Sequence, residues 1–527
     1  MRIKSAKTRN FASVPQANIP RSAFDRSHTH KTTFDAGLLV PIFLDEALPG
    51  DTCKLSMTAF ARMATPLFPI MDNMYMSTFF FAVPYRLVWD NWEKLNGAQE
   101  NPGDSTDFIV PTLDSGTGFN ENSIHDYFGI PTGVPDLSVS ALFHRAYNLI
   151  WNEWFRDQNL QESANVPKDD GPDDEAYYKL LRRCKRHDYF TSSLPWPQKG
   201  PSVSPLGSGK IPVTGIGCGS QSYDSNADAY ETGGSGTTSY AGYRAIGGTN
   251  VNYIEEDPDN DGYPGIYANL SNADLTINSL REAFQIQRMF EKDARGGTRY
   301  IEVLRSHFGV VSPDARLQRP EYLGGGSQLI NIHPVAQTSA SEYGDQPGTP
   351  QGSLSAFGTV SLHNHGFTKS FTEHCLLIGL VSVRADLTYQ QGVNRMFTRS
   401  TRYDFYWPSF SHLGEQAVLN KEIFSQGTEA DDAVFGYQER YAEYRYKPSM
   451  ITGAFRSNAA LPLDTWHLSQ QFADLPTLGS AFIEEDPPMT RILAVADEPH
   501  FIFDSLFSYR CARPMPVFAT PGLVDHF

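Results

Sequence analysis

The sequence lacks the features that mark disulfide-rich, secreted or membrane proteins. Its five cysteines are an odd number, are widely scattered, and include no pair at metal-ligand spacing. This usage fits a reducing compartment better than a disulfide framework. The longest strongly apolar run, Cys375–Val383, has nine residues, well below the ~18 that indicate a membrane span. We therefore expect no membrane insertion.

The sequence also lacks the usual catalytic motifs. It contains no G-x-S-x-G nucleophile elbow and no H-E-x-x-H helix. His363 and His365 could bind a metal from one face of a strand, but no acidic or cysteine partner stands at a fixed spacing, so structural histidines are favoured. We predict that the protein is not an enzyme and has neither a cofactor nor a metal site.

One acidic string resembles a calcium-binding loop. DPDNDG at Asp257–Gly262 matches the first, third, fifth and sixth positions of such a loop. The twelfth position holds Ala268 in place of the chelating Glu, and Pro258 and Pro264 interrupt the pattern. A solvated acidic turn is therefore favoured over calcium binding, and both alternatives stay open.

The composition favours a β protein with many short elements. The chain has 42 glycines and 35 prolines, which interrupt it at short intervals. Aromatic residues make up 13% and can fill a large core. Period-two or β-rich patterns predict strands at Cys53–Met63, Met74–Val83 and Phe371–Ala385. The GGGS string at Gly324–Ser327 predicts a tight turn.

Two stretches have the period of a helix. In Ala141–Leu160 the apolar residues recur at spacings of three and four, and Ser279–Ala294 begins with capping-box spacing and is followed by two glycines. Between them, residues 200–269 are rich in Gly, Ser, Asp, Asn and Tyr. Such a composition indicates a surface insertion and not core.

Charge is unevenly distributed along the chain. The net charge is −17, yet residues 1–31 carry seven basic residues against Asp25, a net +6, which leaves −23 for the rest. Clustered Lys and Arg bind phosphates without reading base sequence. We expect a basic N-terminal arm at 1–31, without regular structure, that contacts nucleic acid; the alternative is a solubilising tail. The predicted contacts are Arg2, Lys4, Lys7 and Arg9.

A tyrosine-rich segment is the best candidate for a protein interface. YQERYAEYRY places Tyr437, Tyr441 and Tyr444 among alternating acidic and basic residues. Aromatic anchors beside paired charges are typical of interfaces. An ordinary amphipathic surface is equally consistent with the pattern.

Several long strings resemble the major capsid proteins of gokushovirus-type single-stranded-DNA bacteriophages of the family Microviridae. They occur in the order of that family and cover nearly the whole chain. The strings are RSAFDRSHTHKTTFDAG (Arg21–Gly37), LPGDT (Leu48–Thr52), VWDNW (Val88–Trp92), SPDARLQRPEYLGGGS (Ser312–Ser327), GYQERYAEYRYKPS (Gly436–Ser449) and DTWHLSQQF (Asp464–Phe472).

This resemblance implies a mainly β fold, an eight-stranded antiparallel jelly roll with long loop insertions and a few short helices. Residues 32–527 would form one capsid domain, and the segment near 200–269 a threefold protrusion used for host attachment. The implied function is self-assembly into a small T=1 icosahedral shell, in the virion, around circular single-stranded DNA.

Further partners are implied by the same resemblance. They are minor capsid or pilot proteins, DNA-binding proteins and scaffolding proteins of the phage, and a bacterial surface receptor; synthesis would take place in the host cytoplasm.

Two alternative functions from other classes are a lectin-like jelly roll and a glycan-cleaving enzyme. Neither explains a basic arm joined to an acidic body.

Overall fold

The computed structural model describes residues 20–201, 277–297, 299–310, 318–343 and 346–518. The chain divides into two units, residues 200–290 and the remainder. Of the smaller unit, the structure describes residues 200–201 and the first part of one helix. The architecture below is that of the larger unit.

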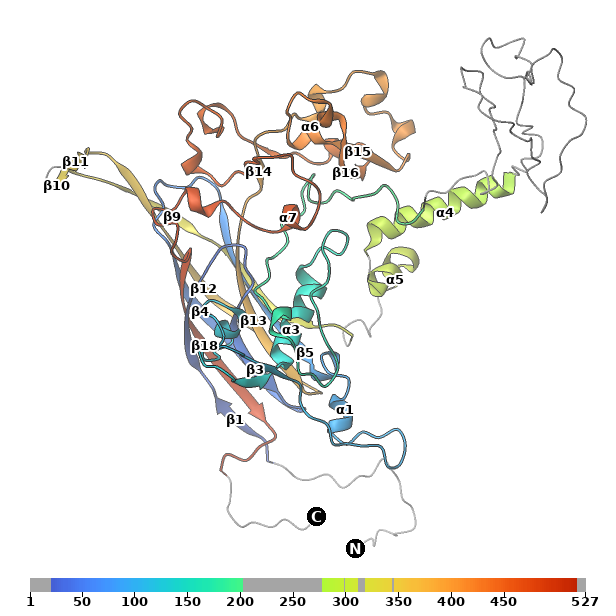
Figure 1. Ribbon diagram of the computed structural model, residues 1–527, viewed down its shortest axis with the longest axis vertical. Coiled ribbons are helices and arrows are strands. Elements are labelled where there is room, and N and C mark those ends of the chain that lie inside the picture. The colour runs from blue at the N-terminus through green and yellow to red at the C-terminus, as the bar shows by residue number, and fades with distance from the viewer. Residues whose placement is uncertain (1–19, 202–276, 298, 311–317, 344–345, 519–527) are drawn as a thin grey trace, which may run out of the picture. The chain divides into compact units, whose positions relative to one another are not determined.

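Two antiparallel sheets form its centre (Figure 1). The larger sheet has the order β1-β18-β4-β12-β9, with β2 also paired to β18. Its strands are β1 (Ser22–Asp25), β2 (His28–Phe34), β4 (Thr52–Met63), β9 (Asn331–Ala336), β12 (Leu354–Ser370) and β18 (Phe501–Arg513). The second sheet has the order β3-β13-β5-β8. Its strands are β3 (Val40–Ala47), β5 (Met74–Pro84), β8 (Glu321–Leu329) and β13 (Cys375–Ala385).

Shorter elements connect and cover the sheets. The remaining strands form two-stranded pairs: β6 (Thr112–Asp114) with β7 (Ser138–Ser140), β10 (Ser341–Tyr343) with β11 (Gln346–Thr349), β14 (Thr388–Tyr389) with β17 (Ser449–Met450), and β15 (Glu415–Leu419) with β16 (Val434–Glu439). The helices are α1 (Trp92–Leu95), α2 (Ile124–Tyr127), α3 (Leu142–Ile150), α4 (Ile277–Gly296), α5 (Tyr300–Phe308), α6 (Asn420–Ile423) and α7 (Ser480–Ile483). Among the described residues, no helix is long and apolar enough to cross a membrane.

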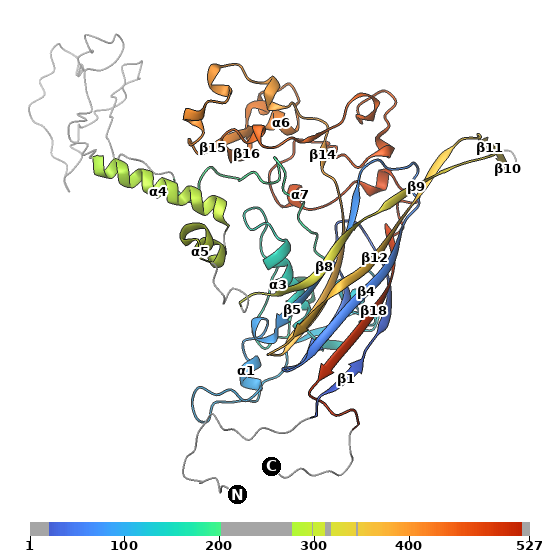
Figure 2. The same cartoon turned by 180° about the vertical axis from the view of Figure 1, so that it is seen from behind.

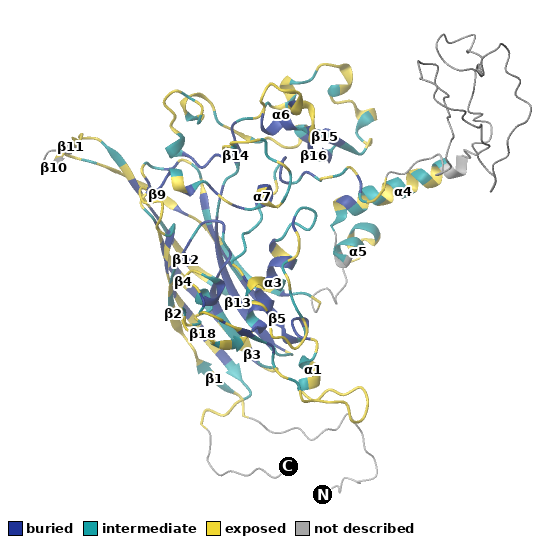
Figure 3. Ribbon diagram, in the orientation of Figure 1, coloured by how far each residue is buried: buried dark blue, intermediate teal, exposed yellow. Residues whose placement is uncertain are grey.

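The six-stranded sheet has one buried and one exposed face, as its sequence predicts. Along β4 every second residue from Cys53 to Met63 is buried, and β18 alternates in the same way. The buried side chains meet those of β3, β5 and β13 in a core that includes Phe43, Phe80 and Phe503. The predicted strand at Cys53–Met63 is therefore confirmed, and Figure 3 shows the exposed outer face.

The four-stranded sheet is covered on both faces, so its central strand is almost wholly apolar. One face of β13 joins the core between the sheets, and the other face, with Leu376, Ile378 and Leu380, packs in a second core that includes α3. Figure 2 shows this arrangement from behind. The predictions of strands at Met74–Val83 and Phe371–Ala385 are confirmed, except that the second strand begins at Cys375 and not at Phe371.

Both predicted helices are present, with different ends. α4 spans Ile277–Gly296, around the predicted Ser279–Ala294. α3 continues as a single π-helical turn at Trp151–Phe155 and ends there, before the predicted Leu160. The wider turn changes which side chains face inward. Trp151 and Phe155 are buried, whereas Trp154, which the predicted helical period places on one face with Tyr147 and Ile150, is partly exposed.

The prediction of a tight turn at Gly324–Ser327 is wrong, because this string lies inside β8. Added Cβ atoms at Gly324 and Gly325 would lie 2.2 Å from the Gly366 carbonyl oxygen and 2.1 Å from that of Thr78. The glycines thus allow β8 to approach both β5 and β12 closely. Close backbone approach, and not a turn, explains the string.

The N-terminal segment also differs from its prediction. Residues 1–19 of the expected arm lie outside the described residues. Ser22–Asp25 and His28–Phe34, however, are strands that pair with β18. The prediction of an arm without regular structure is therefore wrong for these residues. The mostly polar sequence hid these strands. They pair with β18 along the backbone, and β2 adds ring contacts, such as that of His28 with Phe507 at 5.1 Å and that of buried Phe34 with Phe501 at 5.7 Å.

Candidate interaction surface

Residues 388–483 form a region built mostly of loops at one end of the two sheets (Figure 1). It contains β14 to β17, α6, α7 and several single turns of 3-10 helix. Its apolar core is small and also takes in two residues from outside the region, Tyr189 and Phe190. We call residues 388–483 the loop-built region. Because its elements are short, polar contacts have a large part in holding it together.

Glu422 of α6 is the centre of the polar contacts. Its buried carboxylate accepts hydrogen bonds from the Tyr189 hydroxyl (2.8 Å), Arg395 (2.9 Å) and the Leu419 backbone N–H (3.0 Å). Burial raises the pKa of Glu422, and the charge of Arg395 opposes that rise. The carboxylate therefore fixes the segment around Arg395 against the core of the region.

Large aromatic and apolar side chains lie exposed on this framework. Phe397 is 75% exposed and Tyr444 is 51% exposed. We define the aromatic surface as Phe397, Tyr403, Phe405, Tyr406, Trp407, Tyr444, Tyr446 and Met450, all of which are exposed. Clusters of exposed large apolar side chains mark interaction sites more often than chance.

Arginine side chains hold several of these rings in place. The guanidinium of Arg399 lies 4.4 Å from the centroid of the Tyr444 ring, and that of Arg402 lies 4.5 Å from Trp407. Arg399 also forms an ion pair with Glu443 at 3.4 Å. Such cation–π contacts restrict the rings before any partner binds, which lowers the entropy cost of association.

A groove lies beside the aromatic surface. Its volume is about 400 Å³, and its walls include Phe190, Arg395, Phe397, Tyr446 and Met450. An apolar wall with a few charged groups suits an inserted aromatic or aliphatic side chain. The aromatic surface and the groove can thus act as one docking area.

The three tyrosines predicted for an interface occupy different environments. Tyr444 is exposed, whereas Tyr441 is 4% exposed and its backbone has a φ of 65°. The Tyr441 hydroxyl accepts a hydrogen bond from the Trp407 backbone N–H, so Tyr441 supports the surface from below. Tyr437, in β16, is partly buried. Direct contact with a partner therefore stays a prediction for Tyr444 and does not fit Tyr441.

Sequence reasoning missed the other half of the aromatic surface. RYDFYWPSF at Arg402–Phe410 supplies Tyr403, Phe405, Tyr406 and Trp407. The feature that could have identified this segment is its high density of aromatic residues in a stretch with neither a helical nor a strand period. The fold brings this string next to Tyr444, from which it is separated in sequence.

The other predicted sites can be placed only in part. Arg2, Lys4, Lys7, Arg9 and the acidic string Asp257–Gly262 lie outside the described residues. A β-bulge separates His363 from His365, with Asn364 at a φ of 59°. His363 is exposed, while a ring nitrogen of His365 lies 2.8 Å from the Thr78 hydroxyl. Burial lowers the pKa of His365.

Comparisons with known proteins agree with this geometry. A family model described as "Capsid protein (F protein)" matches residues 12–523. The chain is 48% identical to capsid protein VP1 of Bdellovibrio phage phiMH2K over 98% of both chains, and 46% identical to capsid protein VP1 of Chlamydia phage 1 over 99% of both. It is 36% identical to capsid protein VP1 of Spiroplasma virus 4 over 98% of both. The resemblance seen in the sequence is confirmed: the chain belongs to the phage capsid protein (F protein) family.

Proposed function

We propose that this chain is the major capsid protein of a small single-stranded-DNA phage, and that its copies assemble into a T=1 icosahedral shell around a circular genome. The observation that carries the proposal is the aromatic surface, whose large side chains are exposed in a single copy and are held in place by Arg399 and Arg402. In a shell a neighbouring copy would cover them.

The strand order supports a jelly roll as the shell-building fold. Two four-stranded sets, β2-β18-β4-β12 and β3-β13-β5-β8, face each other, and along these eight strands the chain passes from one set to the other at every step except from β5 to β8. In this fold each sheet protects its strands from edge pairing, while the connecting loops supply the area for contacts between copies. The loop-built region belongs to the long connection between β13 and β18.

Encapsidation would depend on the N-terminal residues. The net +6 of residues 1–31 contrasts with the acidic remainder, and the basic Arg2, Lys4, Lys7 and Arg9 would bind DNA phosphates inside the shell. Pilot, DNA-binding and scaffolding proteins of the phage would take part in assembly in the host cytoplasm. Residues 200–269 would carry the protrusion that attaches to a bacterial receptor.

The test is assembly in the presence of the phage partner proteins, followed by electron microscopy and nuclease digestion. We expect closed uniform shells that protect single-stranded DNA. Replacing Arg2, Lys4, Lys7 and Arg9 by glutamine should leave shells that protect much less DNA. The matched control replaces four exposed basic residues outside the arm by glutamine: Lys54, Arg62, Lys94 and Arg510. Small soluble oligomers in place of shells would contradict the capsid proposal, and equal loss of protection in both variants would contradict the role of the arm.

A further inference from the structure

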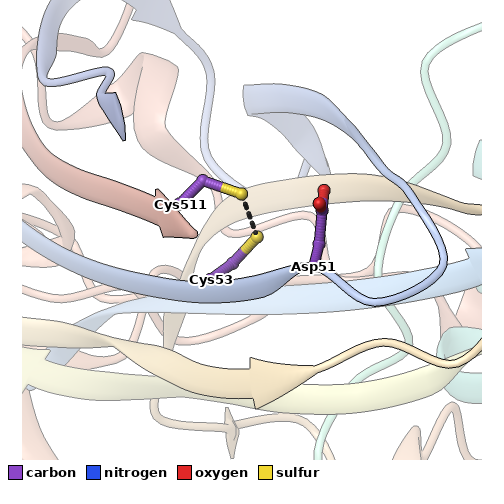
Figure 4. A group of neighbouring side chains, drawn as sticks. All are labelled: Asp51, Cys53 and Cys511. Carbon is purple, nitrogen blue, oxygen red and sulfur yellow. Dashed lines mark hydrogen bonds between the residues drawn. The ribbon is translucent and has the colours of Figure 1, made fainter. Parts of the chain in front are cut away.

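Three fully buried side chains lie together where the end of β18 pairs with the start of β4 (Figure 4). Cys53 of β4 and Cys511 of β18 are direct partners in the antiparallel ladder, and their sulfur atoms are 3.0 Å apart. Asp51 lies just before β4, beside the two sulfur atoms. The ligand atoms of all three residues lie within 4.8 Å of one another.

The carboxylate of Asp51 has one oxygen that no group satisfies. Its Oδ2 accepts hydrogen bonds from the Leu48 backbone N–H at 3.0 Å and from Arg513 Nε at 2.9 Å. Its Oδ1 is buried and has no hydrogen-bond partner among the described residues. An unpaired buried carboxylate oxygen costs free energy. A ligand that binds Oδ1 would remove this cost.

We propose that Asp51, Cys53 and Cys511 bind one zinc ion through Oδ1 and the two sulfur atoms. Two thiolates and a carboxylate are a donor set that zinc accepts, and water can complete four-coordination. Binding breaks the two S–H bonds and releases both protons to solvent, with no change of oxidation state.

The charges at this position balance when zinc is bound. Two thiolates and one carboxylate carry −3, and the ion with the Arg513 guanidinium carries +3. The nearby Arg26 and Asp45 add one charge of each sign, so the sum stays zero; Asp45 pairs with Arg26 and also lies 3.9 Å from Arg513. A buried site of zero net charge avoids the large cost of an uncompensated charge in the interior.

Zinc would satisfy more of these buried atoms than a disulfide would. Two sulfur atoms at about 2.3 Å from one tetrahedral zinc lie about 3.8 Å apart, so binding would widen the 3.0 Å separation of Cys53 and Cys511. A disulfide needs the sulfur atoms at about 2.05 Å and would leave Asp51 Oδ1 without a partner. A thiol–thiol hydrogen bond leaves the same atom unpaired. The bound ion would satisfy Oδ1 and both sulfur atoms together.

The site would join strands that are far apart in the sequence. Cys53 and Cys511 lie 458 positions apart, so no local spacing in the sequence predicts a metal site here. On the other side of β18, Phe24 of β1 is the ladder partner of Cys511. The ion would therefore clamp the C-terminal strand to β4 at the end of the sheet where β1 also pairs. This inference is independent of the shell geometry proposed above.

The first test measures metal in the full-length wild-type protein, assembled with its phage partners in zinc-supplemented cells. Elemental analysis should find about one zinc per chain, and exchange for Co²⁺ should give the intense near-ultraviolet absorption of thiolate–cobalt bonds. A wild-type protein without zinc, whose Cys53 and Cys511 are recovered as free thiols or as a disulfide, would overturn the proposal.

Variants then locate the ion. Cys511→Ser should lose the zinc and the cobalt absorption, whereas Cys375→Ser, which alters a buried cysteine of β13, should keep both. Zinc retained in full by Cys511→Ser would show adventitious binding elsewhere and would also overturn the proposal. If Cys511→Ser does not fold, Asp51→Asn is the second variant: it keeps both sulfur atoms and should bind zinc more weakly than the wild type, and unchanged zinc binding in Asp51→Asn would overturn the proposal.

Discussion

The two-sheet core and the loop-built region are held together in different ways. In the core, long strands such as β4 and β13 bury apolar side chains in continuous layers and satisfy their backbone groups in ladders. In the loop-built region, short elements surround a small core, and buried polar groups such as Glu422 and Gln438 make specific contacts. The core thus depends on buried area, and the loop-built region on the geometry of individual hydrogen bonds.

The largest expected effect is the loss of an aromatic ring between the sheets. Phe80 of β5 is fully buried against Phe43 and Phe367. Phe80→Ala should lower the free energy of unfolding by about 3–5 kcal/mol, because it removes apolar contacts and leaves a cavity. Urea unfolding of the unassembled chain measures this. The control Phe60→Ala alters a half-exposed ring on the outer face of β4 and should change stability by less than about 1 kcal/mol. Similar losses in both variants would contradict an area-dependent core.

A smaller and more local effect is expected at Glu422. Glu422→Ala removes the acceptor for Tyr189, Arg395 and Leu419, and each buried donor left unpaired costs about 1–3 kcal/mol. We expect faster amide exchange in residues 388–483 and little change in β4 or β13. Glu429→Gln, at an exposed carboxylate nearby, is the control. Exchange that increased equally in the core strands would show that the two regions unfold as one unit.

The difference between the two-sheet core and the loop-built region also explains how much of the structure could be predicted from the sequence. The strands β4, β5 and β13 follow directly from periodicity, because a half-buried strand alternates and a strand covered on both faces is apolar throughout. β1 and β2 were missed because their stability comes mainly from backbone pairing with β18, which leaves little apolar pattern.

The aromatic surface was predicted only at Tyr444, from tyrosines that stand among acidic and basic residues. The same pattern included Tyr441, whose burial beneath Trp407 is a tertiary contact that no local period encodes. The pairing of Cys53 with Cys511 is likewise a result of strand register across nearly the whole chain. Local patterns thus predict elements, whereas sites formed by distant segments need the fold.

A substitution on the aromatic surface of the loop-built region should have the smallest effect on the stability of the single chain. It should nevertheless have a large effect on assembly. Phe397→Ser alters a ring that is 75% exposed, so the free energy of unfolding of the single chain should change by no more than about 0.5 kcal/mol. If a neighbouring copy covers this ring, its loss should weaken association by about 2 kcal/mol, roughly 30-fold. Light scattering during assembly measures the association.

The matched control for Phe397→Ser lies on the exposed face of the six-stranded sheet. Ile502→Ser alters a side chain on the outer face of β18 that is 61% exposed and should also leave folding unchanged. If Phe397→Ser reduces assembly and Ile502→Ser does not, contact between copies depends on the loop-built region, and the core supplies mainly its support. If Ile502→Ser reduces assembly as strongly, the outer sheet face is also an interface, and the division between a supporting core and a binding region fails.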